Sequence, residues 1–306
     1  MNRILIIKHG SLGDIVFSLP IMHSIRTRYP NASINVLTEK KYFNFLYRTN
    51  FFNNIIEDNR SNNIFSSILL LIELIKQKYD VIIDLQNSTR TTYYHLFISI
   101  FGRIKICSSR KFAHIRYYIP PQGTESVIQG LFNQIKLLGI PEIKDIDYNW
   151  LKTNLDDRYK NRIILFIPGV SKNGKEKQWD PTKFGKLAKY CEEKNYYICI
   201  VGTKKDEPSV LPIINICKKI INNIDSSPPE VIYSISQIAT LIISNDTGPG
   251  HIAALTKKNI LWLVNDNSVT KANIPNTPNN FKISSKNIKS ISTEEVINFI
   301  ETNNLI

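Results

Sequence analysis

The chain has 306 residues, of which 42% are hydrophobic and 21% charged, an ordinary balance for a folded protein in water. This length favours two domains of about 150 residues each, and no apolar run reaches the roughly 18 residues that a membrane-spanning helix needs. No signal peptide is visible, so we expect a cytoplasmic protein. A net charge of +13 would usually suggest nucleic acid as a partner. The basic residues are clustered, however, which favours an anionic partner that binds at one region of the protein.

Strands and helices are predicted to alternate in both halves of the chain. In the first half, strands are predicted at 3–8, 33–38, 54–57, 80–85 and 103–107, and helices at 14–28, 63–78, 91–100 and 124–138. In the second half, strands are predicted at 162–167, 196–201, 240–244 and 259–264, and helices at 181–194, 206–219 and 249–255. This alternation is typical of parallel sheets covered on both faces, so we predict an α/β protein with two doubly wound domains.

A polar run at 154–162 separates the last element of the first half from the first strand of the second. We therefore divide the chain into domains at 1–152 and 153–306. A return of the last helix to the first domain is left open by the sequence.

The four cysteines form no CxxC pair and have no spacing with histidine that suggests zinc, so we expect core thiols at Cys107, Cys191, Cys199 and Cys217. One Asp-x-Asp motif occurs at 145–147. We interpret it as a surface loop near the domain boundary, and we expect no metal and no other cofactor.

The loop at 245–251, Asn-Asp-Thr-Gly-Pro-Gly-His, lies between an apolar run and a short helical stretch. Such a loop points backbone N–H groups at one spot, where the helix dipole stabilises an anion such as phosphate. We expect Gly248 and Gly250 to adopt positive φ and let the backbone approach a ligand, and Asp246 or Thr247 to cap the helix. The alternative is an ordinary capped helix after a buried strand.

A second glycine-rich turn, Lys-His-Gly-Ser-Leu-Gly-Asp at 8–14, follows the first strand. It matches neither the GxGxxG nor the P-loop pattern, which disfavours a dinucleotide or ATP site. A carboxylate at Asp14, at the start of a helix, can act as a general base, a role that typically contributes about 10²- to 10⁴-fold to the rate. The alternative is that Asp14 only caps the helix.

The loop at 168–179 follows the first strand of the second half and contains Lys172, Lys175 and Lys177. Lysine supplies a point charge for phosphate oxygens, although the loop could also be a solvated surface segment. After the next strand, Asp206 and Glu207 are placed to accept hydrogen bonds from sugar hydroxyls. Acids are favoured at a helix N-terminus in any case.

Six basic residues and no acidic residue lie between positions 90 and 118: Arg90, Arg103, Lys105, Arg110, Lys111 and Arg116. The pattern is typical either of a solvated face or of a surface for a polyanionic partner, such as an acidic glycan, an anionic membrane or nucleic acid.

Four segments in this order, 4–14, 81–86, 168–179 and 244–251, resemble the ADP-heptose:lipopolysaccharide heptosyltransferases of glycosyltransferase family 9. The resemblance spans nearly the whole chain, and its last motif is the most specific. It implies a GT-B fold, in which two Rossmann-like domains face each other across a cleft and the second holds the nucleotide sugar. It also implies transfer of heptose from ADP-heptose to the Kdo/heptose inner core of lipopolysaccharide.

The resemblance implies a role for each matching residue. Asp14 matches the proposed base, and Lys177 matches the lysine that stabilises the diphosphate leaving group. Lys175 is an alternative because the loop looks longer than in typical members, and Gly250 stands where the family often has a larger residue. The implied donor-binding residues are Ser171, Asp206 (or its neighbour Glu207), Asp246, Thr247, Gly248 and His251.

The first domain is expected to hold the acceptor, an anionic glycolipid, in peripheral contact with the inner face of the cytoplasmic membrane. The expected acceptor-binding residues are Ser11, Arg90, Arg110, Lys111 and Arg116. A base on the acceptor side and cations on the leaving-group side predict inversion by direct displacement without a metal.

Three alternatives remain. A family 9 enzyme could use another nucleotide sugar for a different surface glycan. A dinucleotide oxidoreductase is disfavoured by the missing GxGxxG motif. A non-catalytic polyanion-binding protein would need neither Asp14 nor the 245–251 loop, and we expect no nucleic acid partner.

Overall fold

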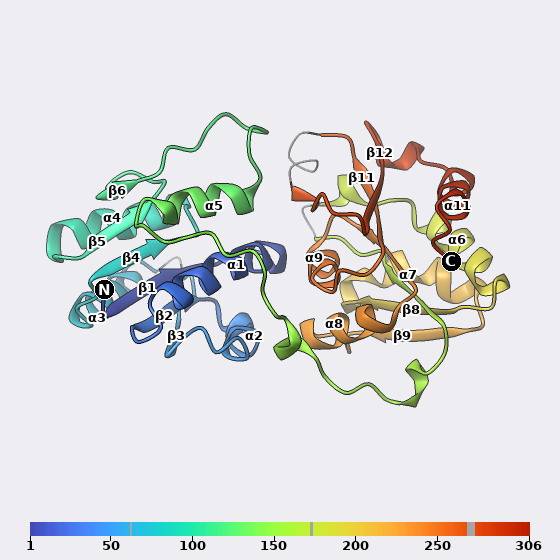
Figure 1. The fold of residues 1–306 in the computed structure, drawn as a ribbon, viewed down its shortest axis with the longest axis horizontal. Coiled ribbons are helices and arrows are strands. Elements are labelled where there is room, and N and C mark those ends of the chain that lie inside the picture. The colour runs from blue at the N-terminus through green and yellow to red at the C-terminus, as the bar shows by residue number, and fades with distance from the viewer. Residues whose placement is uncertain (62, 172–173, 268–272) are drawn as a thin grey trace. The chain divides into compact units, whose positions relative to one another are not determined.

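Two compact units, Met1–Trp150 and Leu151–Ile306, make up the chain in the computed structural model (Figure 1). The structure describes residues 1–61, 63–171, 174–267 and 273–306. Each unit is built on a six-stranded sheet, and the neighbouring strands within each sheet are parallel. The predicted α/β class with two doubly wound sheets is therefore confirmed.

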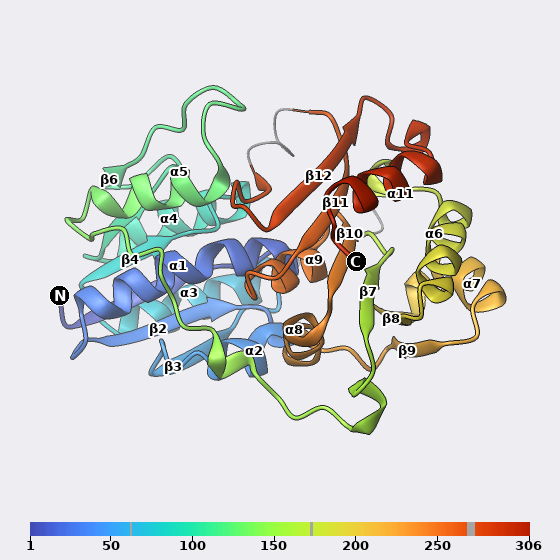
Figure 2. The same ribbon diagram turned by 45° about the vertical axis from the view of Figure 1, so that its right-hand side comes forward.

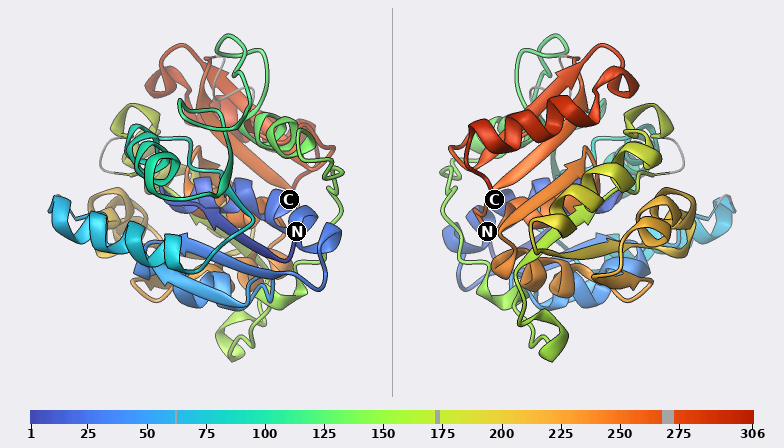
Figure 3. Two further views of the ribbon diagram at one scale, coloured as in Figure 1. Left: turned by 90° about the vertical axis from the view of Figure 1, so that its left-hand side faces the viewer. Right: turned by 90° about the vertical axis from the view of Figure 1, so that its right-hand side faces the viewer.

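The first sheet has the strand order β3-β2-β1-β4-β5-β6. Its strands are β1 (Arg3–Ile7), β2 (Ser33–Thr38), β3 (Asn54–Glu57), β4 (Val81–Asp84), β5 (Lys105–Ser108) and β6 (Ile115–Arg116). The helices of this unit are α1 (Leu12–Arg28), α2 (Phe43–Tyr47), α3 (Ile64–Lys76), α4 (Thr89–Phe101) and α5 (Val127–Lys136). Helices α3 and α4 cover one face of the sheet, and α1 and α5 cover the other (Figure 2, Figure 3).

The second sheet repeats this topology with the order β12-β11-β10-β7-β8-β9. Its strands are β7 (Ile163–Ile167), β8 (Tyr197–Gly202), β9 (Ile220–Ile224), β10 (Leu241–Asn245), β11 (Ile260–Asn265) and β12 (Asn280–Ser285). The helices are α6 (Pro181–Glu193), α7 (Glu207–Ile216), α8 (Pro229–Ile238), α9 (Gly248–Ala254) and α11 (Thr293–Thr302). The buried face of α11 carries Val296 and Ile300, which belong to the core of this unit. The last helix therefore packs within its own unit.

The central strands are apolar on both faces because helices cover both sides of each sheet. Strand β7 is buried over its whole length, and so is β4. The four cysteines are free and buried, as predicted. Burial raises the pKa of the Cys107 and Cys199 thiols to about 12, so both are protonated at neutral pH. No helix among the described residues is long and apolar enough to cross a bilayer.

Both sheets contain a point at which the strand order reverses. The first chain half runs outward from β1 to β3 and then returns to place β4 on the other side of β1. The second half does the same from β7 to β9 and back to β10. In open α/β sheets, ligands bind beyond the carboxyl ends of the strands at this reversal. The loops after β1, β4, β7 and β10 are therefore the places to look for function.

Several elements escaped prediction because their sequences are short or polar. Strand β9 contains Asn222 and Asn223; the buried Asn223 side chain accepts a hydrogen bond of 2.7 Å from Tyr159 Oη and donates one to Cys199 Sγ, so its polar atoms are paired. Helices α2 and α8 and the strands β6 and β12 were also missed. Pro20 lies in the middle of the 17-residue α1.

Candidate active site

The turn after β1 positions Asp14 at the start of α1. Ser11 is the N-cap, and Asp14 is the third residue of the helix, where its carboxylate completes a capping box with Ser11; Asp14 therefore helps to cap the helix but is not itself the N-cap. Asp14 Oδ2 accepts hydrogen bonds from Ser11 N and from Ser11 Oγ, both of 2.7 Å. Gly10 has φ +111°, and a Cβ there would lie 2.6 Å from Asp14 Oδ2. Only glycine fits this turn, which holds the carboxylate in a defined, half-buried position.

The turn after β1 is tied to the loop after β4. His9 N donates to Gln86 Oε1 at 3.0 Å, and the buried Lys8 Nζ donates to Leu85 O at 3.2 Å. Burial lowers the pKa of Lys8, while the negative charges of Asp14 and Asp84 raise it. Lys8 therefore lies close enough to Asp14 and Asp84 for their charges to act on it, although burial has the larger effect on its pKa.

Asp84, at the carboxyl end of β4, anchors this edge of the first sheet. It is fully buried and accepts hydrogen bonds from Gln86 N at 2.9 Å, Asn87 N at 3.1 Å and Ser108 Oγ at 3.1 Å. Burial raises its pKa, but the fully buried His95, 3.1 Å away, and these hydrogen bonds outweigh burial, so the pKa is lowered. The segment 81–86 carried the family resemblance, but no sequence reasoning gave Asp84 this role.

The basic run between 90 and 118 does not form a single surface. The Arg90 guanidinium donates to Tyr94 Oη at 2.6 Å and to Ser61 O at 3.0 Å, so its hydrogen bonds are made within its own unit. Arg110 Nε donates to Thr92 Oγ1 at 2.9 Å. Arg103 and Lys105 lie at the start of β5, the end of the sheet opposite to Asp14. Lys111 and Arg116 are exposed near the carboxyl ends of the strands.

In the second unit, the loops after β7 and β10 bring Lys177, Asp246 and His251 together. Lys177 Nζ donates to Asp246 Oδ2 at 2.9 Å, and His251 Nε2 lies 3.1 Å from Asp246 Oδ1. Burial raises the pKa of Asp246, but His251 and Lys177 outweigh burial and lower it to about 2. The cluster thus combines an ionised carboxylate with two groups that can carry positive charge.

Asn245 is hydrogen-bonded to both ends of the loop at 168–179, called the lysine loop below. Its Nδ2 donates to Pro168 O at 2.8 Å, and its Oδ1 accepts from Trp179 N at 3.1 Å. Asn245 is fully buried, so both hydrogen bonds are made away from water, where leaving either backbone group unpaired costs most. Sequence reasoning treated Asn245 only as the first letter of its motif and missed this clamp.

The two glycines of the 245–251 loop act differently from the prediction. Neither Gly248 nor Gly250 has positive φ, and both lie in the regular helix α9, whose N-cap is Thr247. A Cβ at Gly250 would lie 2.4 Å from Ser244 Oγ and 2.8 Å from the Trp262 ring. Helix α9 packs so closely on the buried Trp262 that position 250 has no room for a side chain larger than that of glycine.

The lysine loop separates its candidate residues. Lys177 is the one that reaches Asp246, whereas Lys175 is exposed in the short helix η4 (Lys175–Lys177) and makes no ion pair among the described residues. Ser171 is exposed, and its carbonyl accepts a hydrogen bond from Gly174 N at 2.8 Å. Lys172 lies outside the described residues.

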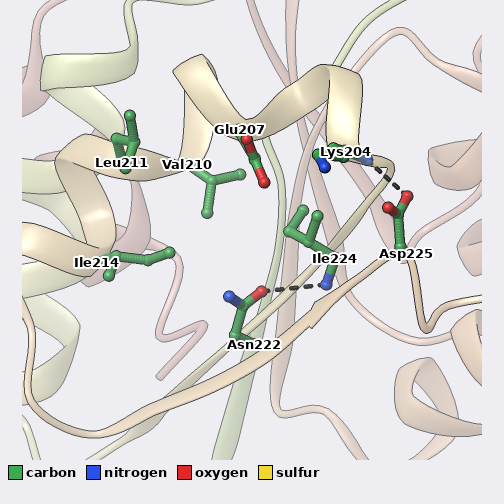
Figure 4. A pocket seen from close by; sticks show the side chains of 8 residues that line it. All are labelled: Lys204, Glu207, Val210, Leu211, Ile214, Asn222, Ile224 and Asp225. Carbon is green, nitrogen blue, oxygen red and sulfur yellow. Dashed lines mark hydrogen bonds between the residues drawn. The ribbon is translucent and has the colours of Figure 1, made fainter.

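Asp206 and Glu207 point to different places after β8. Asp206 Oδ2 accepts from Thr203 N at 2.8 Å and from Thr203 Oγ1 at 2.9 Å, which caps the short helix η5 (Lys204–Asp206). Glu207 instead lines an open cavity of about 360 Å³ between α7 and β9 (Figure 4). The cavity is lined by Lys204, Glu207, Val210, Leu211, Ile214, Asn222, Ile224 and Asp225. Glu207 thus lines this cavity, whereas the Asp206 carboxylate lies beside the loop after β7, where a Cβ at Gly169 would overlap it.

The model of glycosyltransferase family 9 (heptosyltransferase) matches residues 69–295, more than half of the chain. The chain belongs to this family. It is therefore a glycosyltransferase, and its two Rossmann-like units are the two halves of a GT-B fold.

Relatives and solved structures agree with membership of family 9. The chain is 24% identical over 284 residues to lipooligosaccharide heptosyltransferase 2 of Haemophilus ducreyi, covering 84% of this chain and 80% of that protein. Among solved structures, E. coli ADP-heptose lps heptosyltransferase II has a TM-score of 0.77 at 18% identity, covering 100% and 98% of the chains. E. coli heptosyltransferase WaaC with ADP-2-deoxy-2-fluoro heptose has a TM-score of 0.78 at 15% identity, covering 98% and 99%.

The motif residues of this family 9 glycosyltransferase lie at the strand-order reversals of its sheets. Asp14 follows β1, the first strand at the reversal in the first unit. Lys177 follows β7, and Asp246 and His251 follow β10, the two strands at the reversal in the second unit. Among the described residues, no group of three or more His, Cys, Asp or Glu side chains is arranged to hold a metal ion.

Proposed function

We propose that this glycosyltransferase transfers heptose from ADP-heptose to the inner core of lipopolysaccharide, with inversion at the anomeric carbon and without a metal ion. The observation that carries the proposal is the contact of Lys177 and His251 with Asp246 beyond the reversal of the second sheet. Its support from relatives is the printed name of the Haemophilus proteins, lipooligosaccharide heptosyltransferase 2, and the ADP-2-deoxy-2-fluoro heptose of the WaaC structure.

The donor diphosphate binds to the second unit in this proposal. Lys177 contributes its ammonium, His251 contributes a ring N–H, and Thr247, Gly248 and Ser171 lie in the adjoining loops. The side chain of Lys177 is 38% exposed, so its charge is accessible to a phosphate oxygen. Glu207, which lines the cavity, accepts hydrogen bonds from the ribose hydroxyls in this proposal; Asp206 is the alternative, since capping engages only its Oδ2 while its Oδ1 lies beside Gly169.

The reaction is a single displacement. Asp14 removes the proton from the acceptor hydroxyl as its oxygen forms a bond to the anomeric carbon of the sugar. The bond from this carbon to the diphosphate oxygen breaks, and the electron pair leaves with the nucleotide diphosphate. Lys177 stabilises the negative charge that develops there, a role that metal ions fill in other enzymes. Attack opposite to the leaving group inverts the anomeric configuration.

The acceptor is an anionic glycolipid that binds the first unit at the inner face of the cytoplasmic membrane. Ser11, Arg110, Lys111 and Arg116 are the candidate contacts near the carboxyl ends of the strands. Arg90 is not among these contacts, since its guanidinium is hydrogen-bonded to Tyr94 Oη and Ser61 O.

Calorimetric titration with ADP, UDP, GDP and dTDP tests the donor. ADP should bind at least tenfold more tightly than the other three diphosphates. Preference for another nucleotide would overturn ADP-heptose as the donor and favour a family 9 transferase for a different surface glycan. Lys177→Gln should weaken ADP binding, while Lys175→Gln, the matched control in the same loop, should leave it unchanged.

A further inference from the structure

The first unit exposes an unusual concentration of large apolar side chains. Of the seventeen large apolar side chains that are exposed among the described residues, ten lie between positions 64 and 119. They are Ile64, Phe65, Leu69, Ile72, Tyr93, Ile100, Phe101, Phe112, Tyr118 and Ile119. The second unit, of similar length, exposes three. A concentration of exposed apolar side chains is typical of an interaction site.

Most of these side chains belong to the outer faces of α3 and α4. Phe65, Leu69 and Ile72 recur at helical spacing on α3, with Phe65 74% and Leu69 63% exposed. Leu71 and Leu74 form the opposite, buried face of the same helix. Helix α3 is thus apolar on both sides, although only one side packs on the sheet.

Helix α4 continues the apolar surface. Tyr93 and Ile100 are 66% and 64% exposed, and the Phe101 ring, 66% exposed, lies 4.7 Å from the ring of Phe97. The C-terminal ends of the two helices adjoin, because a Cβ at Gly102 would lie 3.3 Å from Ile75 Cγ1. The two helices lie on the same side of the first sheet (Figure 3).

The charges around this surface are predominantly positive. Exposed basic side chains lie at both ends of the first sheet: Lys76, Lys78, Arg103 and Lys105 near the amino ends of its strands, and Lys111 and Arg116 near the carboxyl ends. Of the three acidic residues between 59 and 124, Asp84 is buried and Asp80 accepts the backbone N–H groups of Asn2 and Arg3. Glu73 is the remaining one.

We infer that the α3–α4 face docks on an anionic lipid bilayer. Apolar and aromatic side chains that insert at the headgroup level, flanked by lysine and arginine, are the chemistry that a membrane surface recognises. A second copy of this chain fits less well, because a symmetric contact would bring the same positive charges face to face. The bilayer setting follows from the proposed glycolipid acceptor, but vesicle binding itself requires neither donor nor acceptor.

Flotation with lipid vesicles tests this surface. The protein should float with vesicles containing phosphatidylglycerol and bind those of phosphatidylcholine alone at least about tenfold more weakly, since each basic residue near an anionic surface adds attraction. Phe65→Ser with Leu69→Ser should weaken binding to anionic vesicles about tenfold or more. Lys76→Gln with Arg103→Gln should weaken it about tenfold on anionic vesicles and leave neutral vesicles unaffected.

Two controls make the result specific to this face. Leu137→Ser, at a 49% exposed position following α5 on the other face of the sheet, should leave flotation unchanged. Glu73→Lys should tighten binding to anionic vesicles. The inference fails if wild-type protein does not float, if Leu137→Ser lowers flotation as much as the α3 variant, or if light scattering shows a dimer that Phe65→Ser abolishes. Unchanged melting temperatures show that each variant is folded, and a failed donor titration leaves this test intact.

Discussion

Asp246→Asn tests whether the carboxylate stabilises the second unit through its two partners. The side chain is 11% exposed and lies between Lys177 Nζ at 2.9 Å and His251 Nε2 at 3.1 Å. Burial alone would raise the pKa of Asp246, but His251 and Lys177 lower it to about 2 from the ordinary value of 3.8. Because the pKa is lower in the folded state, the ionised carboxylate stabilises the fold above pH 4, and this contribution is lost as the pH falls toward about 2.

The size of the effect follows from the pKa difference. At about 1.36 kcal/mol per pKa unit, the lowering from 3.8 to about 2 corresponds to about 2 kcal/mol at pH 7 and about 1 kcal/mol at pH 3. Asn has the same shape as Asp but no charge, so Asp246→Asn should be less stable than wild type by these amounts.

Equilibrium urea unfolding followed by tryptophan fluorescence measures the difference. Trp179 and Trp262 are both fully buried in the second unit and report its unfolding. Glu176→Gln, an exposed change one residue before Lys177, is the control and should leave the free energy of unfolding unchanged. A stability difference between wild type and Asp246→Asn that is equal at pH 3 and pH 7 would refute the electrostatic explanation.

Three further outcomes are expected. Gly250→Ala should destabilise the second unit by about 1–3 kcal/mol in urea unfolding, because its Cβ would overlap the Trp262 ring; stability within 0.5 kcal/mol of wild type, roughly the experimental error, would contradict this packing. Asp14→Asn should lower kcat by about 10²- to 10⁴-fold with an unchanged Kd for ADP, and unchanged turnover would exclude the base role. Glu207→Gln should weaken ADP binding about tenfold by calorimetry, whereas Asp206→Asn should mainly lower the melting temperature; the reverse pattern would assign the ribose to Asp206.

The fold could be predicted where strands are apolar on both faces. Strand β7 and strand β10 are buried throughout, and continuous apolar runs in their sequences mark them clearly. Strands β9 and β12 could not be predicted in the same way, because both are edge strands in which polar residues interrupt the apolar ones. Their presence is decided by pairing with β8 and β11, which the local sequence does not encode.

The site could be predicted in part. Loops after parallel strands lie at the same edge of a sheet, so the sequence places Lys177 and Asp246 at one edge. Contacts between side chains from distant segments of the chain could not be predicted. Arg90 lies in a basic run, yet its bond to Ser61 and its position 3.8 Å from Asp58 draw it into its own unit. The different surroundings of the neighbouring Asp206 and Glu207 carboxylates are likewise visible only in the structure.

The contact between Lys177 and Asp246 is compatible with donor binding, and the reason lies in the number of hydrogens on the ammonium. A lysine ammonium carries three N–H donors, and Asp246 accepts one of them, so two remain for phosphate oxygens. The carboxylate orients the ammonium toward the loop after β10, while His251 contacts the carboxylate from the other side. Lys177→Arg keeps the charge but changes the geometry of the donors. The Lys177→Arg variant should therefore keep the stability of the second unit but bind ADP more weakly. Unchanged ADP affinity would show that the positive charge alone is enough for ADP binding.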